Sequence, residues 1–592
     1  MSISKKILAA TLALSVVGVS AGITALAATE HWNDASASTD TAVSSEWESW
    51  KTEWETVKNN HEQIVLTPGS DASQLNFGWY SKAADNAKVR ISKSADMSDA
   101  KEFTGTANDS KEIDGQTYYS NKVTATDLEE NTTYYYQYLL DGEWTNAEKY
   151  TTKDTKNFSV FYVGDPQIGA SKGQTASEST DKQTAELAAR NDAFNWNKTL
   201  EAATAKFPDV SFMLSAGDQI NQTDVSTEAN ELEQAYEYAG FLNADALKSL
   251  PVATTIGNHD SKSENYKNHF NNPNSFVEET SPSVAGNGYY FTYGDVLFMV
   301  INTNNYNCAD HENLINKATT ENPDAKWRIV MFHQDIYGSG LDHSDSDGII
   351  LRTQLTPIFD KYDIDVVLQG HDHTYSRTYQ LTGDGQEHTA YPVEDSDQKY
   401  NNSNAEYLAQ NQCYNIVDKT SGTVTDPEGT IYMEANSATG SKFYELIAEQ
   451  QDYIAARSQT WTPTYSVIDF TTADDGSSTS FTINTYDVTT GDKIDDSYTI
   501  TKTLATDDTD NTDTDNTDTD NTDTDNTDTD NTDTDNTDNG NADNGNNNSG
   551  KGDSTKTDTV QTGDTDIVFF VAIAGITSAA IAVVLFKKKK EA

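Results

Sequence analysis

Clusters of metal-capable side chains recur along the middle of this chain. They are Gly164-Asp165-Pro166-Gln167, Gly217-Asp218-Gln219-Ile220-Asn221, Gly257-Asn258-His259-Asp260, Phe332-His333-Gln334 and Gly370-His371-Asp372-His373. Oxygen donors from Asp and Asn, together with nitrogen donors from His, suit two adjacent divalent or trivalent transition metals. A structural zinc site would instead gather Cys and His at close spacing. The donor set therefore predicts a two-metal centre of the kind that hydrolases use.

Strands must position these donors, because each cluster follows a short, largely apolar or β-branched run. The runs are residues 160–163, 210–214, 252–256, 329–331 and 366–368. Open α/β sheets place their ligand sites at the carboxyl ends of strands. The spacing therefore predicts a site built at strand ends.

The order Asp, Gly-Asp, Gly-Asn-His-Asp, His, Gly-His-x-His resembles that of the calcineurin-like metallophosphoesterases. The stretch 360–377 and a β-rich segment directly upstream resemble the purple acid phosphatase-like branch, and the resemblance covers roughly residues 62–500. It implies an α/β (α+β) fold, in which a metallophosphoesterase β-sandwich flanked by helices follows an all-β fibronectin type III-like sandwich. It also implies hydrolysis of phosphate esters.

The resemblance assigns the ligands to two metals, which could be Fe, Zn or Mn. The implied set is Asp165 and His373 for one metal, Asn258, His333 and His371 for the other, and Asp218 as a bridge. A bridging carboxylate holds two cations about 3.5–4 Å apart. Such a pair lowers the pKa of a shared water toward hydroxide, which would attack phosphorus in line.

Further residues have implied roles in catalysis. His259 follows a ligand Asn, and its imidazolium could donate a proton to the leaving alkoxide. Asp260 is the natural partner to orient that imidazole. His343 stands where the family has a phosphate-contacting His. Arg352 and Arg377 are candidates for supporting contacts.

Two positions depart from the coloured members of the family. Three residues after the bridging Asp they carry a Tyr, whereas this chain has Asn221. A tyrosinate favours ferric iron and gives the purple colour, and Asn221 is a neutral oxygen donor at most. Gln167 stands two residues after Asp165, where many relatives place a ligand His. The sequence therefore leaves the metals unidentified.

The segments around the catalytic region have distinct patterns. In 28–61, three Trp and a Val recur at helical spacing (Trp47, Trp50, Trp54 and Val57), which predicts an amphipathic helix that caps the next domain. A carbohydrate-binding aromatic stripe is the alternative. Residues 62–152 read as an antiparallel sandwich, and 128–136 resembles the tyrosine corner of fibronectin type III-like domains.

Residues 157–502 alternate strands with helical segments at 178–206 and 228–244, which predicts two facing β-sheets with helices outside. The polar segment 380–427 is expected to be a loop insertion near the cleft. The two cysteines, Cys308 and Cys413, lie far apart in the sequence. They are equally compatible with one disulfide and with two buried thiols.

The ends of the chain carry signals for export and anchoring. Residues 1–27 combine a basic start with an apolar run and a small-residue end, as a secretory signal peptide does. Within 559–592, the apolar stretch 567–586 is about 20 residues long, enough to cross a bilayer, and four lysines follow it. Residues 559–564, Thr-Val-Gln-Thr-Gly-Asp, resemble a Gram-positive cell-wall sorting signal with Thr-Val in place of Leu-Pro. The expected location is extracellular and wall-anchored, with sortase and peptidoglycan as partners; a plain membrane anchor is the alternative.

The formal net charge is −54; it is densest in the Asn-Thr-Asp repeats of 503–558 but is negative elsewhere as well. Such a tract has nothing to bury and repels itself, which favours an extended spacer. It lacks the turn Gly and distal Glu of an EF-hand loop, which argues against a calcium site. No basic stripe is present for nucleic acid. Anionic substrates would therefore be attracted by bound metals rather than by the overall field.

The leading hypothesis is a surface phosphomonoesterase. A phosphodiesterase or nucleotidase would use the same site. A surface adhesin with a vestigial metal site is the alternative of another class, and the intact set of ligands argues against it because decay usually removes ligands first.

We expect the mature chain to end at Thr562, because a sortase would cut between Thr562 and Gly563 and attach the chain to the wall. Digestion of isolated walls with a muralytic enzyme should release protein that lacks everything after Thr562. Release by detergent alone, with Lys587 to Lys590 still attached, would instead indicate the membrane anchor.

Overall fold

The computed structural model describes residues 32–34, 41–84, 86–177, 180–277, 283–341, 343–344, 348–388, 407 and 410–504. The expected signal peptide (1–27) and the sorting signal with its apolar stretch (567–586) lie outside these residues, as does the expected spacer beyond Leu504. Among the residues described, none of the helices combines the length and the apolarity needed for crossing a bilayer.

The N-terminal domain is the predicted antiparallel sandwich. One sheet has the order β1 (Val65–Pro68), β2 (Leu75–Ser81), β6 (Gln116–Ala125), β5 (Thr106–Ile113). The other has the order β4 (Lys101–Thr104), β3 (Lys88–Ser92), β7 (Thr133–Leu140), β8 (Glu143–Trp144), and β9 (Glu148–Thr151) also pairs with β7. Phe77 of the first sheet packs with Val89 and Tyr136 of the second. The Tyr134 hydroxyl accepts a hydrogen bond from the Glu129 N–H at 2.8 Å, which is the expected corner.

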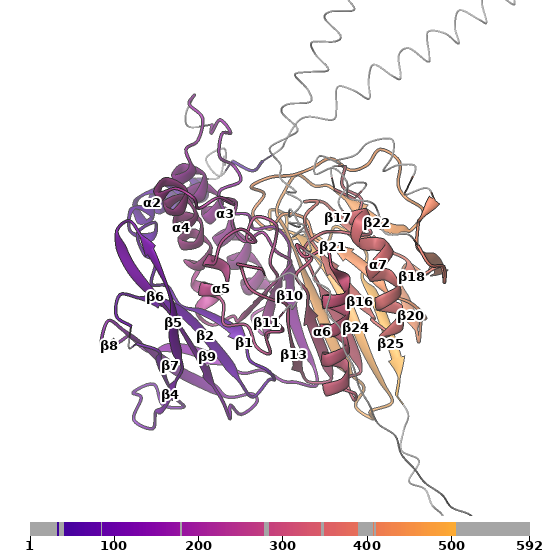
Figure 1. Ribbon diagram of the computed structural model, residues 1–592, viewed down its shortest axis with the longest axis horizontal. Coiled ribbons are helices and arrows are strands. Elements are labelled where there is room, and N and C mark those ends of the chain that lie inside the picture. Colours follow the sequence, from indigo (N-terminus) through magenta and orange to yellow (C-terminus); the bar gives the residue numbers. More distant parts are fainter. Residues whose placement is uncertain are drawn as a thin grey trace, which may run out of the picture. The chain divides into compact units, whose positions relative to one another are not determined.

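Two seven-stranded sheets form the second domain (Figure 1). The first sheet has the order β12 (Val252–Thr254), β11 (Phe212–Ser215), β10 (Phe158–Val163), β23 (Thr464–Thr472), β24 (Ser478–Asp487), β25 (Tyr498–Thr503), β20 (Thr423–Thr425). The second has the order β13 (Tyr289–Tyr293), β14 (Val296–Val300), β15 (Trp327–Met331), β16 (Val366–Gln369), β21 (Ile431–Glu434), β17 (Tyr375–Thr378), β22 (Ile454–Ser458). Side chains from both sheets, such as Phe212, Phe298 and Phe470, share one core, so the sheets face each other as predicted.

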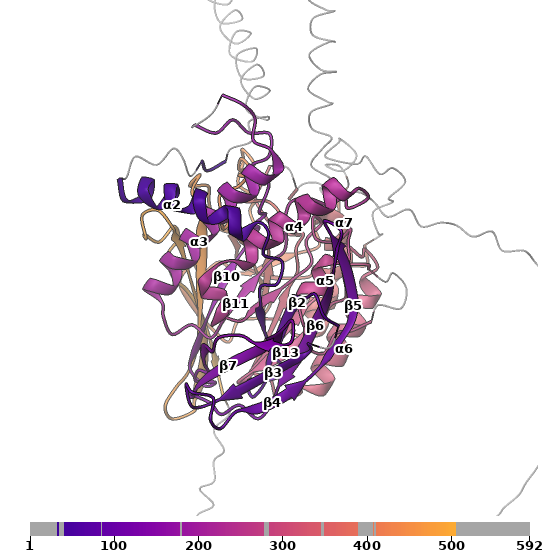
Figure 2. The same ribbon diagram turned by 90° about the vertical axis from the view of Figure 1, so that its left-hand side faces the viewer.

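Helices cover the outer faces of this sandwich. On the first sheet lie α3 (Ala185–Lys206) and α4 (Glu228–Leu242), with the short η2 (Asp245–Lys248) and α5 (Asn265–His269) nearby. On the second lie α6 (Cys308–Glu321) and α7 (Gly348–Lys361), visible in Figures 1 and 2. The Thr184 side chain caps α3 by accepting from the Leu187 N–H, a contact that typically contributes about 1 kcal/mol.

The strand directions explain why the predicted donors meet. β10, β11 and β12 run parallel in one sheet, and β14, β15, β16 and β21 run parallel in the other. Parallel neighbours end at the same edge of a sheet, so each set presents its following loops together.

Several sequence expectations need correction. The predicted N-terminal helix is α2 (Thr41–Val57) and its tryptophans are buried, but it packs on α3 of the second domain rather than on the domain that follows it. Trp50 Nε1 donates to the Arg190 carbonyl at 2.8 Å. Residues 389–406 of the expected loop insertion 380–427 lie outside the described residues. The described parts of this segment contain β18 (Gln380–Thr382), β19 (Asn415–Asp418) and β20, so those parts are less irregular than expected. Cys308 and Cys413 are both free and buried, which is one of the two states that the sequence left open.

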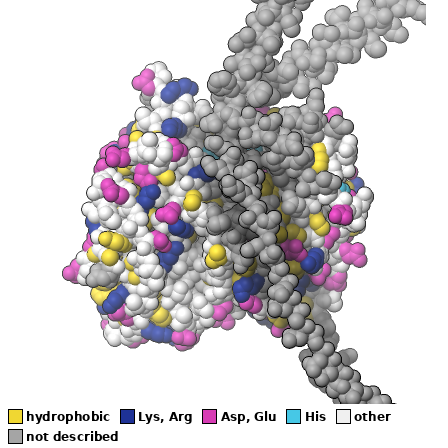
Figure 3. All heavy atoms as spheres, in the orientation of Figure 1, with side chains coloured by type: hydrophobic (Ala, Val, Ile, Leu, Met, Phe, Trp, Pro, Cys, Tyr) yellow, Lys and Arg dark blue, Asp and Glu magenta, His cyan; other side chains and the backbone are white. Residues whose placement is uncertain are grey.

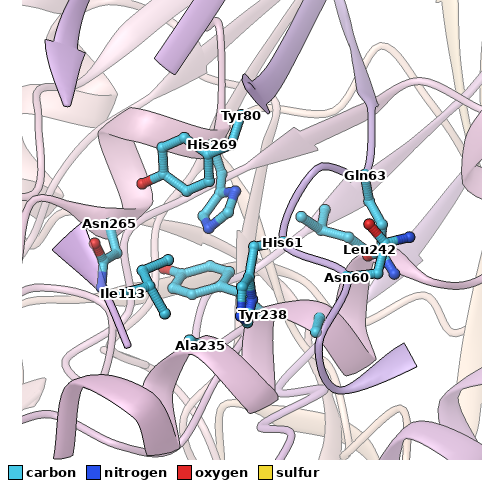
Figure 4. Close-up of a pocket in the computed structure, with 11 residues that line it drawn as sticks. Asn60, His61, Gln63, Tyr80, Ile113, Ala235, Tyr238, Leu242, Asn265 and His269 are labelled. Carbon is cyan, nitrogen blue, oxygen red and sulfur yellow. The ribbon is translucent and has the colours of Figure 1, made fainter. Parts of the chain in front are cut away.

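A seam of polar and aromatic side chains joins the two domains. The Ser120 Oγ donates to the Asn268 carbonyl at 2.6 Å. Nearby, a cavity of about 10 Å³, room for about one water molecule, is lined by the rings of His61, Tyr80, Tyr238 and His269 (Figure 4). The His269 ring lies 4.7 Å from that of Tyr80 and 4.3 Å from that of Tyr238, measured between centroids.

Burial lowers the pKa of His269 to about 3, with nearby His61 and Lys122 adding to the shift. Burial also lowers the pKa of His61 to about 4, and Lys82 adds to it. Both rings are therefore neutral in the folded protein at pH values where the unfolded chain binds a proton. Their contribution to stability is present above about pH 6.5 and is lost as the pH falls toward 4.

We expect the free energy of unfolding to fall by about 2 kcal/mol for His269 alone between pH 7 and 5. A His269→Phe variant should lose that part of the pH dependence in denaturant titrations at the two pH values. His388→Gln is the matched control, because the pKa of His388 is raised by Asn411 and Asp384 against the effect of burial. An unchanged pH dependence in His269→Phe would contradict this account.

Candidate metal centre

The structure brings the predicted ligands together from separate strand ends. Asp165 follows β10, Asp218 follows β11, and Asn258 follows β12 in the first sheet. His333 follows β15, and both His371 and His373 follow β16, in the second sheet. All six side chains are buried. The site therefore lies where the carboxyl ends of the parallel strands of both sheets meet.

His333 is the centre of one ligand group. Its Nε2 lies 2.8 Å from Asn258 Oδ1, 3.0 Å from His371 Nδ1 and 3.3 Å from Asp218 Oδ2. Its Nδ1 lies 2.9 Å from the Ala216 carbonyl, which can only accept, so Nδ1 carries the proton. The Nε2 atom therefore faces the three other potential ligand atoms.

A second group forms around Asp165. The His373 Nε2 lies 3.5 Å from Asp165 Oδ1, and its Nδ1 lies 2.8 Å from the Lys442 carbonyl. This carbonyl fixes the proton on Nδ1, just as the Ala216 carbonyl does for His333, and such contacts orient metal-binding imidazoles. Asp165 Oδ2 accepts from the His371 N–H at 2.8 Å. The segment that follows β16 therefore contributes to both ligand groups, through His371 and His373.

Asp218 lies between the groups. Its Oδ1 accepts from the His259 N–H at 2.9 Å, while Oδ2 faces His333. The bridging role implied by the resemblance is consistent with this position.

The backbone at the site is held in an unusual conformation. Positive φ angles occur at five non-glycine residues there: Asp165 (45°), Gln167 (35°), Asp218 (46°), His371 (82°) and His373 (47°). Such conformations cost roughly 1–3 kcal/mol each and persist where the surroundings impose them. Gly217, with φ of 105°, also lies so close to His333 that a Cβ there would collide with the imidazole. This close approach explains the Gly-Asp order of the motif.

The donors fit a pair of cations. Asp165 Oδ1 is a buried carboxylate oxygen that accepts no hydrogen bond from the described residues. His333 Nε2 faces the Asn258 and Asp218 oxygen atoms, which can only accept. Ligand atoms of Asp218, His333 and His371 all lie within 4.8 Å of one another. Mixed carboxylate, amide and imidazole donors match Fe, Zn or Mn.

The charged ligand side chains shift one another's pKa values. Burial raises the pKa of Asp165 to about 7, although His333 opposes this shift. Burial would also raise the pKa of Asp218, but His333 and His259 outweigh it and the pKa is lowered. Burial alone would lower the pKa of His333, but the Asp218 and Asp165 carboxylates outweigh burial and raise this pKa to about 10. A metal must therefore displace a proton here, which links metal affinity to pH.

His259 lies beside the ligands, but its predicted partner is different. Its Nδ1 is hydrogen-bonded to the Asn221 carbonyl, and its Nε2 lies 3.9 Å from Asp218 Oδ2. Asp260 does not orient the imidazole: its Oδ2 accepts from the Gly257 N–H at 2.9 Å and the Gln219 N–H at 3.3 Å. The carboxylate is fully buried under the ligand loop, which it stabilises.

The two departures from the family pattern lie next to each other. Gln167 Nε2 donates to Asn221 Oδ1 at 3.4 Å. The Asn221 N–H donates to Glu237 Oε2 at 3.0 Å. Asn221 thus contributes its backbone carbonyl to His259 and its amide oxygen to Gln167.

The remaining candidates separate into two groups. His343 is buried, and its ring centroid lies 3.7 Å from that of His371, so this predicted residue joins the site. Arg377 instead forms an ion pair with Asp495 at 3.0 Å. The Arg352 guanidinium packs 4.5 Å from the Tyr337 ring centroid. The two arginines are therefore structural rather than part of the site.

Sequence reasoning missed Asp372 and the loop after β21. Asp372 accepts hydrogen bonds from the backbone N–H groups of Gly340, His343 and Ser344 at 2.9, 3.0 and 3.1 Å. It therefore fixes the backbone that carries His343. The loop after β21 carries Lys442, and it too follows an apolar strand with polar residues. The same strand-end signal could have found it.

Two models of known protein families match parts of the chain. Residues 159–375 match the family model described as calcineurin-like phosphoesterase. Residues 61–152 match the one described as purple acid phosphatase, N-terminal domain. The chain thus contains a calcineurin-like metallophosphoesterase domain preceded by a purple acid phosphatase N-terminal domain.

The individual proteins that match this chain share little sequence identity with it. Two uncharacterized proteins of Mycobacterium tuberculosis, from strains CDC 1551 / Oshkosh and ATCC 25618 / H37Rv, are each 24% identical over 164 residues. That alignment covers 24% of this chain and 30% of each relative, so the chain spans less than a third of their length.

Sequence identity to solved structures is also low. A purple acid phosphatase from yellow lupin (Lupinus luteus) seeds is 15% identical with a TM-score of 0.47, covering 75% of each chain. A structure of PhoD is 12% identical with a TM-score of 0.45, covering 74% of this chain and 93% of the other. Neither value supports a statement about substrate.

We expect elemental analysis to find about two transition-metal ions per chain. The Asp218→Ala variant should lose these metals. The activity of this variant should fall by more than roughly 100-fold, because losing a residue that only hydrogen-bonds to a metal ligand already costs up to about that much. Asp224→Ala, an exposed carboxylate that bonds Ser226, is the control. We also expect no purple colour, because Asn221 replaces the tyrosine. One metal per active chain, or a tyrosinate absorption band, would contradict this prediction.

Proposed function

We propose that this protein hydrolyses phosphomonoesters at the cell surface with two bound transition metals, Fe, Zn or Mn. The observation that carries the proposal is the gathering of six buried donor residues at the strand ends, with ligand atoms of Asp218, His333 and His371 within 4.8 Å of one another. When bound, such a metal pair supplies an activated water and positive charge for phosphoryl transfer.

The roles of the protein's own residues follow from their contacts. The Asn221 carbonyl fixes a proton on His259 Nδ1, which leaves Nε2 on the side of Asp218. From there a protonated His259 could donate from Nε2 to the leaving oxygen of the ester. His343, stacked on His371, is positioned to contact the phosphate.

A phosphodiesterase or nucleotidase would use the same ligands and the same general acid. An adhesin with a vestigial site is disfavoured, because the ligands and their orienting carbonyls are all in place. The face shown in Figure 3 carries interspersed acidic and basic side chains. Anionic substrates would therefore be drawn to the bound metals rather than to a basic surface.

The proposed location is outside the cell, tethered to the wall. Support comes from the sequence of residues 1–27 and 559–592, with sortase and peptidoglycan as the partners. A plain membrane anchor would place the domain on the same side of the membrane. Either anchor would expose the site to soluble phosphate esters.

We expect His259→Ala to keep both metals but to lower kcat by roughly 10²–10⁴ for alkyl phosphates, the usual worth of a general acid. Aryl phosphates should lose much less, because their leaving groups need little protonation. The comparison variant His343→Ala should raise KM for both substrate types instead. Equal losses of kcat on alkyl and aryl phosphates would assign His259 another role, such as ground-state binding of phosphate.

A further inference from the structure

Helix α4 carries a buried carboxylate beneath the segment that follows β11. Glu237 is inaccessible to solvent. Its Oε2 accepts hydrogen bonds from the Asn221 N–H at 3.0 Å and from the Gln222 N–H at 2.6 Å. The Asn221 N–H is shared with the Ile168 carbonyl, also at 3.0 Å. The carboxylate therefore holds the backbone of two consecutive residues just beyond the Asp218 ligand.

The same carboxylate also packs against the segment that follows β10. Gly169 has a φ of 106°, and a Cβ there would lie 2.1 Å from Glu237 Oε1, so only glycine fits. The segments after β10 and β11 pair with each other, since the Gln167 N–H donates to the Asp218 carbonyl at 2.7 Å. Glu237 thus lies where two ligand-bearing segments meet.

A second polar side chain, one turn earlier on α4, extends this support to the segment that carries His259. Gln234 Nε2 donates to the Gln222 carbonyl. Its Oε1 accepts from Ser263 Oγ at 2.7 Å and from Asn265 Nδ2. These two partners lie a few residues after His259 in the chain. One buried face of α4 therefore fixes both sides of the place where the imidazole lies.

The peptide unit between Asn221 and Gln222 connects Glu237 with His259. In a planar trans peptide, the C=O and the following N–H point in opposite directions. The N–H of this unit points to Glu237. Its carbonyl is hydrogen-bonded to His259 Nδ1, which leaves Nε2 on the side of Asp218, 3.9 Å from Oδ2. The direction of the imidazole therefore depends on the tilt of this one peptide.

We propose that Glu237 is a positioning residue for His259: as an acceptor it holds the 221–222 peptide, and through the Asn221 carbonyl it aims the imidazole. The inference rests on the proposed function, in which His259 donates a proton to the leaving oxygen. A general acid must lie within hydrogen-bond reach of that oxygen. A misplacement of about 1 Å can lower the rate by roughly 100-fold. Glu237 thus contributes to catalysis without touching the substrate.

The test measures kcat of metal-loaded variants on alkyl and aryl phosphates. Glu237→Met removes the acceptor, so kcat for alkyl phosphates should fall about 10- to 100-fold, with a much smaller loss for aryl phosphates and an unchanged metal content. Glu237→Gln should recover most of the loss, because its amide oxygen still accepts, although less strongly than a carboxylate. Glu231→Met is the matched control: this carboxylate of α4 bonds Asn265 and pairs with Lys111, so the alkyl-to-aryl ratio should not change.

A double variant separates positioning from general support of the fold. In a His259→Ala background, Glu237→Met should cause no further loss of kcat, because residues that act as one unit are not additive. An additive loss, equal losses on alkyl and aryl phosphates, or a Glu237→Gln variant as impaired as Glu237→Met would overturn the inference. The proposed function itself fails if the wild type hydrolyses neither ester or if His259→Ala shows no dependence on the leaving group.

A crystal structure of the wild-type holoenzyme with inorganic phosphate covers the case in which Glu237→Met does not fold. The Gln222 N–H should remain bonded to Glu237 and the Asn221 carbonyl to His259 Nδ1. His259 Nε2 should lie within hydrogen-bond distance of a phosphate oxygen, which stands in for the leaving oxygen. A 221–222 peptide turned away from Glu237 while His259 reaches the phosphate would overturn the proposal.

Discussion

The structure depends on the accumulation of carboxylate oxygens and imidazole nitrogens that face one another in a buried site. Asp165, Asp218 and His333 are all essentially inaccessible to solvent. Burying ionised groups without compensation costs several kcal/mol each. Two cations between them would turn this cost into binding energy, so the metals and the fold should stabilise each other. The facing sheets bring the ligands together, because each contributes the ends of its parallel strands.

Hydrogen bonds from neighbouring backbone groups and buried carboxylates hold the ligand side chains and their loops in place. Asp218 and His371 have left-handed backbone conformations, which persist only where the surrounding structure imposes them. Carbonyls at Ala216 and Lys442 hold the imidazoles in one tautomer. The carboxylates of Asp260 and Asp372 gather backbone N–H groups from the loops around them. Buried acids next to the ligands thus organise the site without contacting the reacting atoms.

Much of this could be predicted from the sequence, because a short apolar run followed by Asp, Asn or His is a local pattern. The sandwich architecture follows from such patterns, whereas the tyrosine corner and the approach of His343 to the ligands were expected from the resemblance to known families. The role of Asp260 was mispredicted because adjacency to His259 does not determine the direction of a side chain. The partner of α2 and the place of Lys442 were not predictable, since both depend on contacts between segments far apart in the chain.

The most direct test of the central claim is a crystal structure of protein purified without chelator, with anomalous diffraction measured at the absorption edges of Fe, Zn and Mn. The account predicts two anomalous peaks about 3.5–4 Å apart. They should lie on either side of the Asp218 carboxylate, one contacting Asp165 and His373 and the other His333. A single peak, or two peaks that do not share Asp218, in a crystal of active protein would contradict it.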